Sequence, residues 1–281
     1  MASTAKHYNA HSAETYEEAY FYEPGAYMHY LVELVTQRMQ LDNVNNSGKP
    51  RHILDIGGGT GNFASALIHN CPSSNFRVTV VEPFLEESKG ADMAKSDRMS
   101  FVKAPAEIFL SHSHDNGDWR KQGSHQVLIK ETIHHIDEKV RVGVLKGLYD
   151  DLKAFPCGND ITIPSILIIT RPQVEIDYPL WDEARRVWKE SQPSLEQLQQ
   201  ELQLAGFVDI QCTMERYHSQ ISLQRWQEMI KKRFWSTFAN FSDEELEFGC
   251  EELARERPPD ENGVIHFEDR LLFITGRKVD T

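Results

Sequence analysis

The sequence predicts an α/β fold built on a doubly wound, mostly parallel β-sheet with helices on both faces. Three observations support this prediction. An apolar run at residues 52–56 meets a glycine-rich segment, and a helical pattern begins at Phe63. A β-branched run follows at residues 78–81, which suits a strand buried on both faces. Strand and helix patterns then alternate along the chain, as they do around parallel sheets.

The segment after the first strand has the pattern D-x-G-x-G-x-G, from Asp55 through Gly57 and Gly59 to Gly61. Glycine tolerates positive φ and lets a ligand approach the backbone. The following helix directs its free N–H groups and its positive end into the same space. The dinucleotide fingerprint does not fit, because its third glycine would fall at Asn62. A P-loop is excluded too, since Gly-Lys-Ser/Thr is absent. The loop therefore predicts a ligand site at the carboxyl end of this strand.

An acidic residue ends the predicted second strand, and its sequence separation from the glycine loop is informative. Glu82 stands 21 positions after Gly61. An acid about 20 residues beyond a glycine loop can accept hydrogen bonds from both hydroxyls of a ribose. A solvated loop glutamate is the simpler interpretation, but the spacing favours a ribose contact.

Together, the D-x-G-x-G-x-G motif and the spacing to Glu82 resemble the class I S-adenosylmethionine (SAM) methyltransferases. The resemblance implies SAM as cofactor and S-adenosylhomocysteine (SAH) as product, with a seven-stranded sheet of order 3-2-1-4-5-7-6 whose last strand is antiparallel. It covers nearly the whole chain, although only the first half carries specific motifs. The cofactor contacts that it implies are the glycine loop under the methionine part, Glu82 on the ribose, and Pro83 and Phe84 against the adenine.

The third strand is predicted at residues 99–103. Members of this family often carry an acid shortly after it that contacts the adenine amino group. Here Pro105 stands at that position. The resemblance therefore implies a contact from the backbone near Ala106, or from Glu107.

Residues 1–48 are predicted to form an N-terminal helical lid, and residues 49–281 the SAM-binding domain. The leader is dense in aromatic residues, and in small-molecule methyltransferases such a leader often covers the cofactor. Tyr16 and Tyr20 stand four apart, the spacing of one helical face. We expect Tyr16 at the cofactor and Tyr20 at the substrate. Packing of these aromatics against the sheet edge is the alternative.

The fourth strand, residues 126–130, runs into Glu131-Thr-Ile-His-His-Ile136. Methyltransferases keep a substrate-facing motif here, and many small-molecule members carry a His-His pair in it. His134 and His135 are therefore candidate general bases, because histidine titrates near neutrality. A base is needed only for a hydroxyl or protonated amine, since methyl transfer from a sulfonium mainly requires alignment in a dry pocket. Alternatively, one histidine caps the next helix and the other packs.

Two cations follow the ends of neighbouring strands. Lys130 ends the fourth strand, and Arg171 follows the fifth, which is predicted at residues 163–170. We expect Lys130 to reach the cofactor carboxylate or a substrate acid, and Arg171 to hold a carboxylate bidentately. A surface salt bridge is the alternative for each. The predicted acceptor is thus a small, carboxylate-bearing metabolite that is methylated on sulfur, nitrogen or oxygen.

The second half of the chain is predicted to close the substrate pocket. Residues 173–192 form an insertion, which is expected to contribute Tyr178 and Trp181. Helices at residues 222–256 are expected to contribute Arg225. Ser222 is a predicted N-cap, and Ser242 with Glu245 forms a predicted capping box. The last strand is predicted within residues 264–279.

Composition limits the partners and the compartment. Lys and Arg number 30 against 43 Asp and Glu, a net charge of −13, which disfavours nucleic acid and anionic membranes as partners. No apolar run approaches the roughly 20 residues that span a bilayer, and the first residues lack a signal core. We therefore expect a cytoplasmic protein with a small-molecule substrate, whose oligomeric state the sequence does not indicate. The four cysteines are too far apart for a C-x-x-C motif, so no metal site is predicted.

Other functions stay open at this point. A methyltransferase-like protein can bind SAM, or a partner, without catalysis. An arsenic or thiol methyltransferase is a further alternative. Arsenic methyltransferases share the first motif and use several cysteines on the metalloid, but no cysteine here stands beside a recognisable site motif. An NAD enzyme is disfavoured by Asn62.

Overall fold

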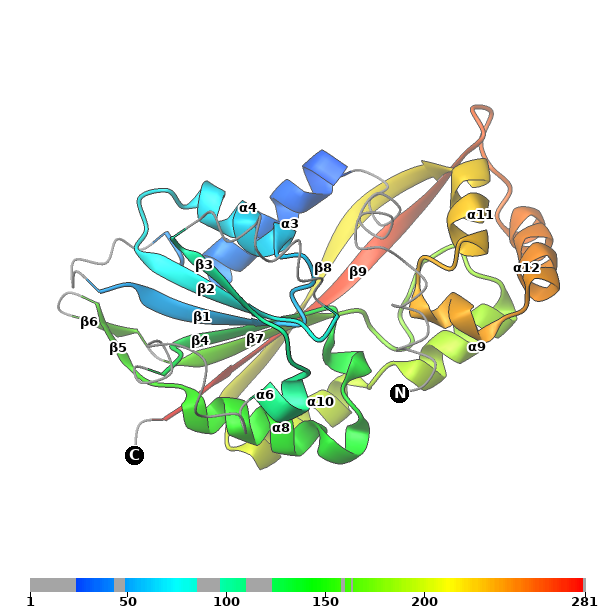
Figure 1. The fold of residues 1–281 in the computed structure, drawn as a ribbon. Coiled ribbons are helices and arrows are strands. Elements are labelled where there is room, and N and C mark those ends of the chain that lie inside the picture. Colours follow the sequence, from blue (N-terminus) through cyan, green and yellow to red (C-terminus); the bar gives the residue numbers. More distant parts are fainter. Residues whose placement is uncertain are drawn as a thin grey trace. The chain divides into compact units, whose positions relative to one another are not determined.

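The computed structural model describes residues 24–42, 49–84, 97–109, 123–157, 160–162 and 164–279 (Figure 1). The predicted lid residues Tyr16 and Tyr20 lie outside the described residues, so their roles stay predictions.

Seven strands form one sheet in the order β3-β2-β1-β4-β7-β9-β8. In chain order this is 3-2-1-4-5-7-6, because the two strands numbered 5 and 6 form a separate hairpin. The first five strands of the sheet run parallel, and β9 pairs antiparallel with β7. The predicted order and the antiparallel last strand are confirmed. The strands are β1 (Arg51–Ile56), β2 (Phe76–Val81), β3 (Met99–Val102), β4 (Gln126–Lys130), β7 (Ser165–Thr170), β8 (Val208–Ser222) and β9 (Val264–Arg277).

The hairpin was not anticipated. It pairs β5 (Phe155–Cys157) with β6 (Asp160–Thr162), where the sequence predicted only a turn into the fifth strand. Its two strands are three residues each, too short for the periodicity that identifies strands.

Helices cover both faces of the parallel strands, as predicted. Figure 1 shows α3 and α4 over one face and α8 and α10 over the other. The helices are α3 (Pro24–Arg38), α4 (Asn62–Asn70), α6 (Ala106–Phe109), α8 (Glu138–Asp151), α9 (Asp182–Ser191), α10 (Leu195–Ala205), α11 (Leu223–Lys231) and α12 (Asp243–Glu256), with 3-10 turns η1 (Ile133–His135) and η2 (Ser236–Asn240).

Strand β1 is the middle one of the five parallel strands, and all six of its residues are buried. Asp55 lies opposite Val80 on one side and Leu128 on the other. Because parallel strands end at the same edge, this register brings the chain after Ile56, Val81 and Lys130 to one place. The glycine loop, Glu82 and Glu131 therefore start from a common edge.

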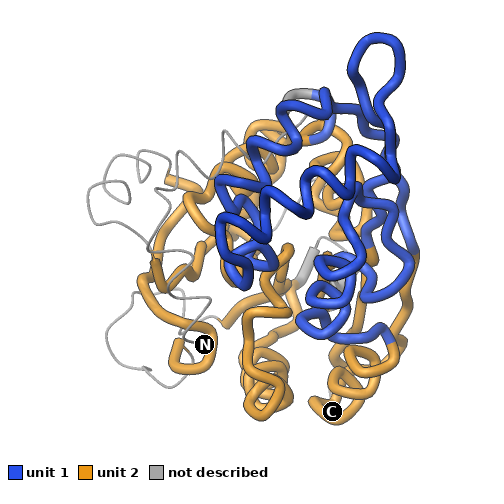
Figure 2. The backbone as a smooth tube through the Cα atoms, turned by 90° about the vertical axis from the view of Figure 1, so that its right-hand side faces the viewer, with its two compact units in different colours: residues 1–27, 171–195, 214–271 blue, residues 28–170, 196–213, 272–281 orange. Residues whose placement is uncertain are grey.

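The chain forms two compact units (Figure 2). Unit 1 comprises residues 1–27, 171–195 and 214–271, and unit 2 comprises residues 28–170, 196–213 and 272–281. Unit 2 contains the parallel strands with the glycine loop. Unit 1 brings together the predicted insertion and the helices of residues 222–256.

An aromatic core holds unit 1 together. Trp226 is fully buried, and its indole N–H donates to the carbonyl of Pro179 at 2.8 Å. Trp188 likewise donates to the carbonyl of Pro172 at 3.1 Å. These two indole rings therefore bury apolar surface while their N–H groups keep hydrogen-bond partners. The largest members of this core are Tyr178, Trp181, Trp188, Trp226, Phe234, Trp235, Phe238, Phe241 and Phe267.

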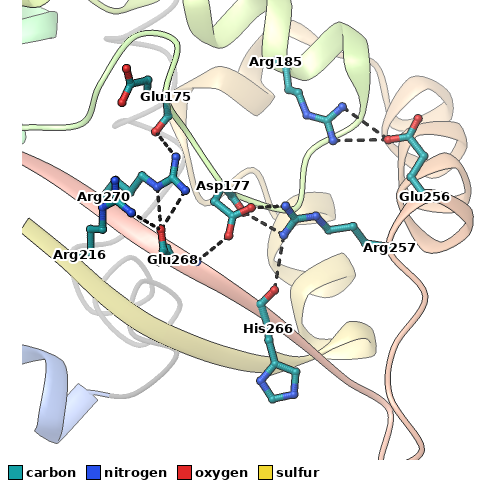
Figure 3. Close-up of polar contacts among 9 residues, drawn as sticks. All are labelled: Glu175, Asp177, Arg185, Arg216, Glu256, Arg257, His266, Glu268 and Arg270. Carbon is teal, nitrogen blue, oxygen red and sulfur yellow. Dashed lines mark hydrogen bonds and ion pairs between the residues drawn. The ribbon is translucent and has the colours of Figure 1, made fainter.

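A polar network joins the insertion to β9 within unit 1 (Figure 3). Asp177 accepts a hydrogen bond from the backbone N–H of Glu268 at 2.9 Å and pairs with Arg257. Arg270 donates to the Glu268 carboxylate at 2.9 Å and to the carbonyl of Glu175 at 3.2 Å. These contacts fix residues 175–177 beside the strand.

Both predicted caps are present. The hydroxyl of Ser222 accepts from the N–H of Arg225, and Ser242 with Glu245 forms a capping box at the start of α12. Over the described part of the chain, none of the helices combines the length and the apolarity that crossing a bilayer requires.

Candidate functional site

The glycine loop leaves an open space at the carboxyl edge of unit 2. Gly57, Gly59 and Gly61 all have positive φ, at 71°, 57° and 81°. A side chain at Gly61 would meet Phe101, whereas a Cβ at Gly59 would have nothing within 4 Å. The loop is thus packed at its ends and open at Gly59, which suits a ligand that lies against the backbone.

Glu82 links the end of β2 to this loop. One carboxylate oxygen accepts from the N–H of Gly59 at 3.1 Å, and the other accepts from the N–H of Phe84 at 3.0 Å. Burial raises the pKa of Glu82, and the two N–H donors oppose that rise. The carboxylate is thus held beside the open part of the glycine loop, and its predicted ribose contact stays a prediction.

Asp55 is buried at the end of β1, with 2% of its surface exposed. Burial raises its pKa to about 7. The positive charge of Lys130 opposes this rise, and the negative charge of Glu82 adds to it. Its Oδ2 atom has no hydrogen-bond partner among the described residues. A buried carboxyl group without a donor is costly, so a donor from a bound group would fit here.

Lys130, Glu131 and Thr132 follow β4 at the same edge. The Lys130 ammonium lies 3.5 Å from a carboxylate oxygen of Glu131 and 5.2 Å from the centre of the Phe63 ring. The Thr132 hydroxyl lies 3.1 Å from the carbonyl of Gly57. The chain after β4 is therefore fixed directly to the glycine loop.

The histidine pair comes next, in the 3-10 turn η1. The rings of His134 and His135 lie 3.9 Å apart between centroids, and both side chains are half-buried. The side chain of Asp137 caps α8 by accepting from the N–H of Lys139. The cap is therefore supplied by Asp137, which removes the alternative in which a histidine caps this helix.

The predicted adenine side of the site is also in unit 2. Ala106 begins α6, and Pro83 follows Glu82 directly. Phe84 and Ile108 are 41% and 44% exposed. Apolar surface of this kind suits a flat, aromatic ligand.

The four substrate-side residues of the second half belong to unit 1. Tyr178 and Trp181 are 1% and 3% exposed in the aromatic core, and Arg225 is exposed on α11. Arg171 is buried, 3.3 Å from Asp269, and donates to the Tyr178 hydroxyl at 2.6 Å. All four lie in a different unit from the glycine loop, and their substrate contacts stay predictions.

Three acids of unit 1 have the spacing of metal ligands. One carboxylate oxygen from each of Asp182, Glu252 and Glu256 lies within 4.8 Å of the others. Arg185 pairs with Asp182 at 2.7 Å. It also pairs with Glu256 at 3.4 Å (Figure 3). This arginine accounts for the proximity of two of the acids.

No protein-family model matches the sequence, and no curated protein sequence matches it either. Solved structures do match. A protein from Anabaena variabilis described as a methyltransferase of an antibiotic biosynthesis pathway superposes with a TM-score of 0.56, at 16% identity over 88% of this chain and 96% of that one. The strand order, the antiparallel β9 and this superposition agree. The chain has the class I methyltransferase fold.

Two further proteins show how varied the class I methyltransferase fold is. Haemonchus contortus phosphoethanolamine N-methyltransferase 2, solved with phosphomonomethylethanolamine and SAH, matches at a TM-score of 0.52 and 16% identity over 89% of this chain. This chain spans 53% of that protein, about half of its length. The [4+2]-cyclase SpnF matches at a TM-score of 0.51 and 15% identity, over 90% of this chain and 81% of the cyclase.

Several residues of this class I methyltransferase fold were missed from the sequence. Glu131 and Thr132 lie in the segment that was singled out for its histidine pair, but their own contacts with Lys130 and Gly57 were not predicted. Asp269 has a weak sequence signal, since it is an acid two positions before the apolar run at residues 271–274.

Proposed function

We propose that the protein is a SAM-dependent methyltransferase that acts on a small molecule. The observation that carries the proposal is the Glu82 carboxylate, fixed by the N–H groups of Gly59 and Phe84 beside the open part of the glycine loop. A ribose needs such an acceptor, and the open backbone at Gly59 leaves room for the rest of the cofactor.

The described residues fit SAM at this edge. The glycine loop would lie under the methionine part, Glu82 would accept from the ribose, and Pro83, Phe84 and the backbone near Ala106 would surround the adenine. Lys130 would face the methionine carboxylate. Oδ2 of Asp55 has no hydrogen-bond partner among the described residues, which supports a bound group that donates a hydrogen bond here. Tyr16, outside the described residues, would complete the cover.

SAM supplies an electrophilic methyl group on a sulfonium. The chain has to align the acceptor with it, exclude water and, for a hydroxyl or protonated amine, remove a proton. His134 and His135 are proposed for the proton, because they are half-buried directly after the edge of β4. Tyr20 is proposed as a cover on the acceptor side.

The finer part of the proposal is a carboxylate on the acceptor. Lys130 and Arg171 are its candidate partners, and each already faces an acid, Glu131 and Asp269 respectively. Lys130 retains 18% side-chain exposure against 6% for Arg171, which favours Lys130 as the group that an acceptor carboxylate reaches. Tyr178, Trp181 and Arg225 remain proposed substrate contacts.

Two alternatives are weighed against this function. An arsenic-directed enzyme needs reactive cysteines, yet burial raises the pKa of Cys212 and raises that of Cys250 to about 11, which suppresses the thiolate. An enzyme that methylates a thiol substrate needs no cysteine of its own, and the thiols of the substrate panel test that function. Binding of SAM without methyl transfer is the second alternative, and the likeness to a [4+2]-cyclase is the observation that keeps it open.

A two-step experiment separates these functions. Calorimetric titration with SAM, SAH and NAD comes first, and we expect micromolar binding of SAM and SAH and none of NAD. SAH formation is then measured with a panel of small acids, amines and thiols. Turnover supports the proposal, binding without any turnover favours the non-catalytic alternative, and the absence of SAM binding refutes it.

A further inference from the structure

Gly57 and Thr132 lie directly against each other at the carboxyl edge of unit 2. A Cβ at Gly57 would overlap the Cγ2, Oγ1 and Cβ atoms of Thr132. Gly57 also has a φ of 71°, so the close approach and the backbone conformation both require glycine here. The first glycine of the loop is therefore taken up by contact with the chain after β4, whereas Gly59 is open.

Hydrogen bonds hold this contact from both sides. The hydroxyl of Thr132 donates to the carbonyl of Gly57 at 3.1 Å, and the N–H of Gly57 donates to the carbonyl of Val81 at 2.7 Å. The same hydroxyl lies 3.0 Å from the carbonyl of Lys130, so its single proton is shared between two acceptors. Thr132 thus connects the end of β4 to the loop that follows β1.

Thr132 also begins the turn that carries the histidine pair. It is the residue directly before η1, and its carbonyl accepts from the N–H of His135 at 2.8 Å. Ile133, the first residue of η1, is fully buried and anchors the turn in the core. The hydroxyl of Thr132 therefore contacts the glycine loop while its carbonyl contacts the histidine turn, and a single residue joins the two.

We propose that Thr132 is a positioning residue that couples the glycine loop to the histidine pair. When a ligand covers the loop, the carbonyl of Gly57 is held in place, and the hydroxyl of Thr132 then fixes the start of η1. The ring positions of His134 and His135 thereby depend on the state of the loop, as alignment for proton removal requires. The inference rests on the proposed methyl transfer and adds to it a residue that acts through others.

A purely local role for the Thr132 hydroxyl is the simpler alternative. Threonine side chains commonly bond nearby backbone groups, and the contact with the carbonyl of Lys130 has this form. The two roles differ in what the hydroxyl affects. A local bond contributes to stability alone, whereas coupling also changes the histidine rings and the affinity of the loop for its ligand.

The test removes the Thr132 hydroxyl and uses matched variants. Thr132→Val keeps the shape without the hydroxyl, and Thr132→Ser keeps the hydroxyl without the methyl group. Thr132→Ala also lacks the hydroxyl, and serves if valine does not pack beside Gly57. Thr79→Val is the control, because the Thr79 hydroxyl on β2 likewise has two partners, His52 and Ser100, each at 2.8 Å.

Three properties are measured on the full-length proteins. Thermal unfolding reports stability, and calorimetric titration with SAH reports affinity at the loop. NMR titration between about pH 5 and 8 follows the imidazole C–H signals of the histidine pair, with and without SAH. The variants His134→Gln and His135→Gln assign these signals.

Coupling predicts that these properties change together. Thr132→Val raises the Kd for SAH about 2- to 10-fold, the effect of one neutral hydrogen bond, and shifts the signals of both rings in the ligand-free protein. SAH then moves these signals less than it does in the wild type. Thr132→Ser restores the affinity and the signals. Thr79→Val lowers the melting temperature without changing either.

Two results overturn the inference. Wild-type histidine signals in ligand-free Thr132→Val would show that the hydroxyl does not position the rings. Equal behaviour of Thr132→Val and Thr79→Val, with stability as the only change, would assign Thr132 a purely local role. Absence of SAH binding by the wild type would instead refute the proposed function, and the ligand-free spectra would still decide whether Thr132 positions the rings.

Discussion

The hydroxyl of Tyr27 donates a 2.6 Å hydrogen bond to the carboxylate of Asp269, although 242 positions separate the two residues in the chain. The same carboxylate pairs with Arg171 and accepts from Tyr178. Asp269 is fully buried. One acid therefore satisfies three side chains that come from the two other segments of unit 1.

Asp269→Ala should destabilise the protein strongly. It leaves the Arg171 guanidinium buried without its carboxylate, and breaking a buried pair in this way costs about 3–5 kcal/mol. Tyr27→Phe, which removes one bond to the same carboxylate, should cost about 1.5–3 kcal/mol. Urea unfolding measures both, with exposed Glu261→Ala as the control, which should change stability by less than about 0.5 kcal/mol. A wild-type unfolding midpoint for Asp269→Ala would contradict this account of the cluster.

Glu82→Ala should weaken SAM binding without unfolding the protein. The change removes the acceptor for the ribose and releases the N–H of Gly59. A hydrogen bond to a charged group contributes about 1.5–3 kcal/mol, so the Kd should rise about 10- to 150-fold. Calorimetric titration is the measurement, with exposed Glu33→Ala as the control. Equal SAM affinity in folded Glu82→Ala protein would refute the ribose assignment.

Asp55 should make the ligand-free protein less stable as the pH rises. Burial raises its pKa to about 7, so the folded state holds a proton that the unfolded state releases near pH 4. The stabilisation is complete below pH 4 and is lost as the pH rises through about 7. In Asp55→Asn this loss should disappear, which melting temperatures between pH 4 and 8 will show. Parallel curves for the two proteins would mean that Asp55 ionises normally.

The buried histidines His52 and His125 should make the protein less stable as the pH falls. The N–H of His52 donates to Nδ1 of His125 at 2.8 Å, and burial is the main cause that lowers the pKa of each ring to about 4. Asp151 opposes this for both rings. Both must charge on unfolding, so stability should be lost as the pH falls from about 6.5 through 4. In His125→Asn, urea midpoints over this range should fall less steeply than in the wild type, and an identical slope would argue against the pair.

Gly249→Ala should destabilise unit 1. A Cβ at this position in α12 would come within 2.5 Å of the Trp181 ring, and overpacking of this kind costs about 1–3 kcal/mol. Gly143→Ala in α8 is the matched control, because a Cβ there meets nothing within 4 Å, and alanine should stabilise that helix by about 0.5–1 kcal/mol. Circular dichroism during thermal unfolding measures both. A harmless Gly249→Ala would show that Trp181 can move aside.

The fold of the parallel strands could be predicted from the sequence because its signals are local. The residues before Gly57 and those before Glu82 are apolar runs of the right length, and the glycine loop between them marks the order of elements. The capping box that begins at Ser242 likewise involves only four consecutive residues. Such features depend mainly on residues that are close to one another in the sequence.

The candidate site was predictable only in part. Glu82 could be identified because its spacing from the loop is a sequence property. The partner of Arg171 could not, because Asp269 lies 98 positions away and their contact depends on how unit 1 folds. Glu131 has a φ of 55° and donates its N–H to the carbonyl of Ile169 in the neighbouring strand, and no local sequence pattern indicates either feature.

The aromatic core of unit 1 also determines what can be observed in solution. The chain has five tryptophans, of which Trp181, Trp188, Trp226 and Trp235 are buried together in unit 1, while the described residues of unit 2 include none. These four indoles make intrinsic fluorescence mainly a report on unit 1. Phe84→Trp would place an indole at a 41% exposed position beside Glu82, and would provide unit 2 with an optical probe of its own.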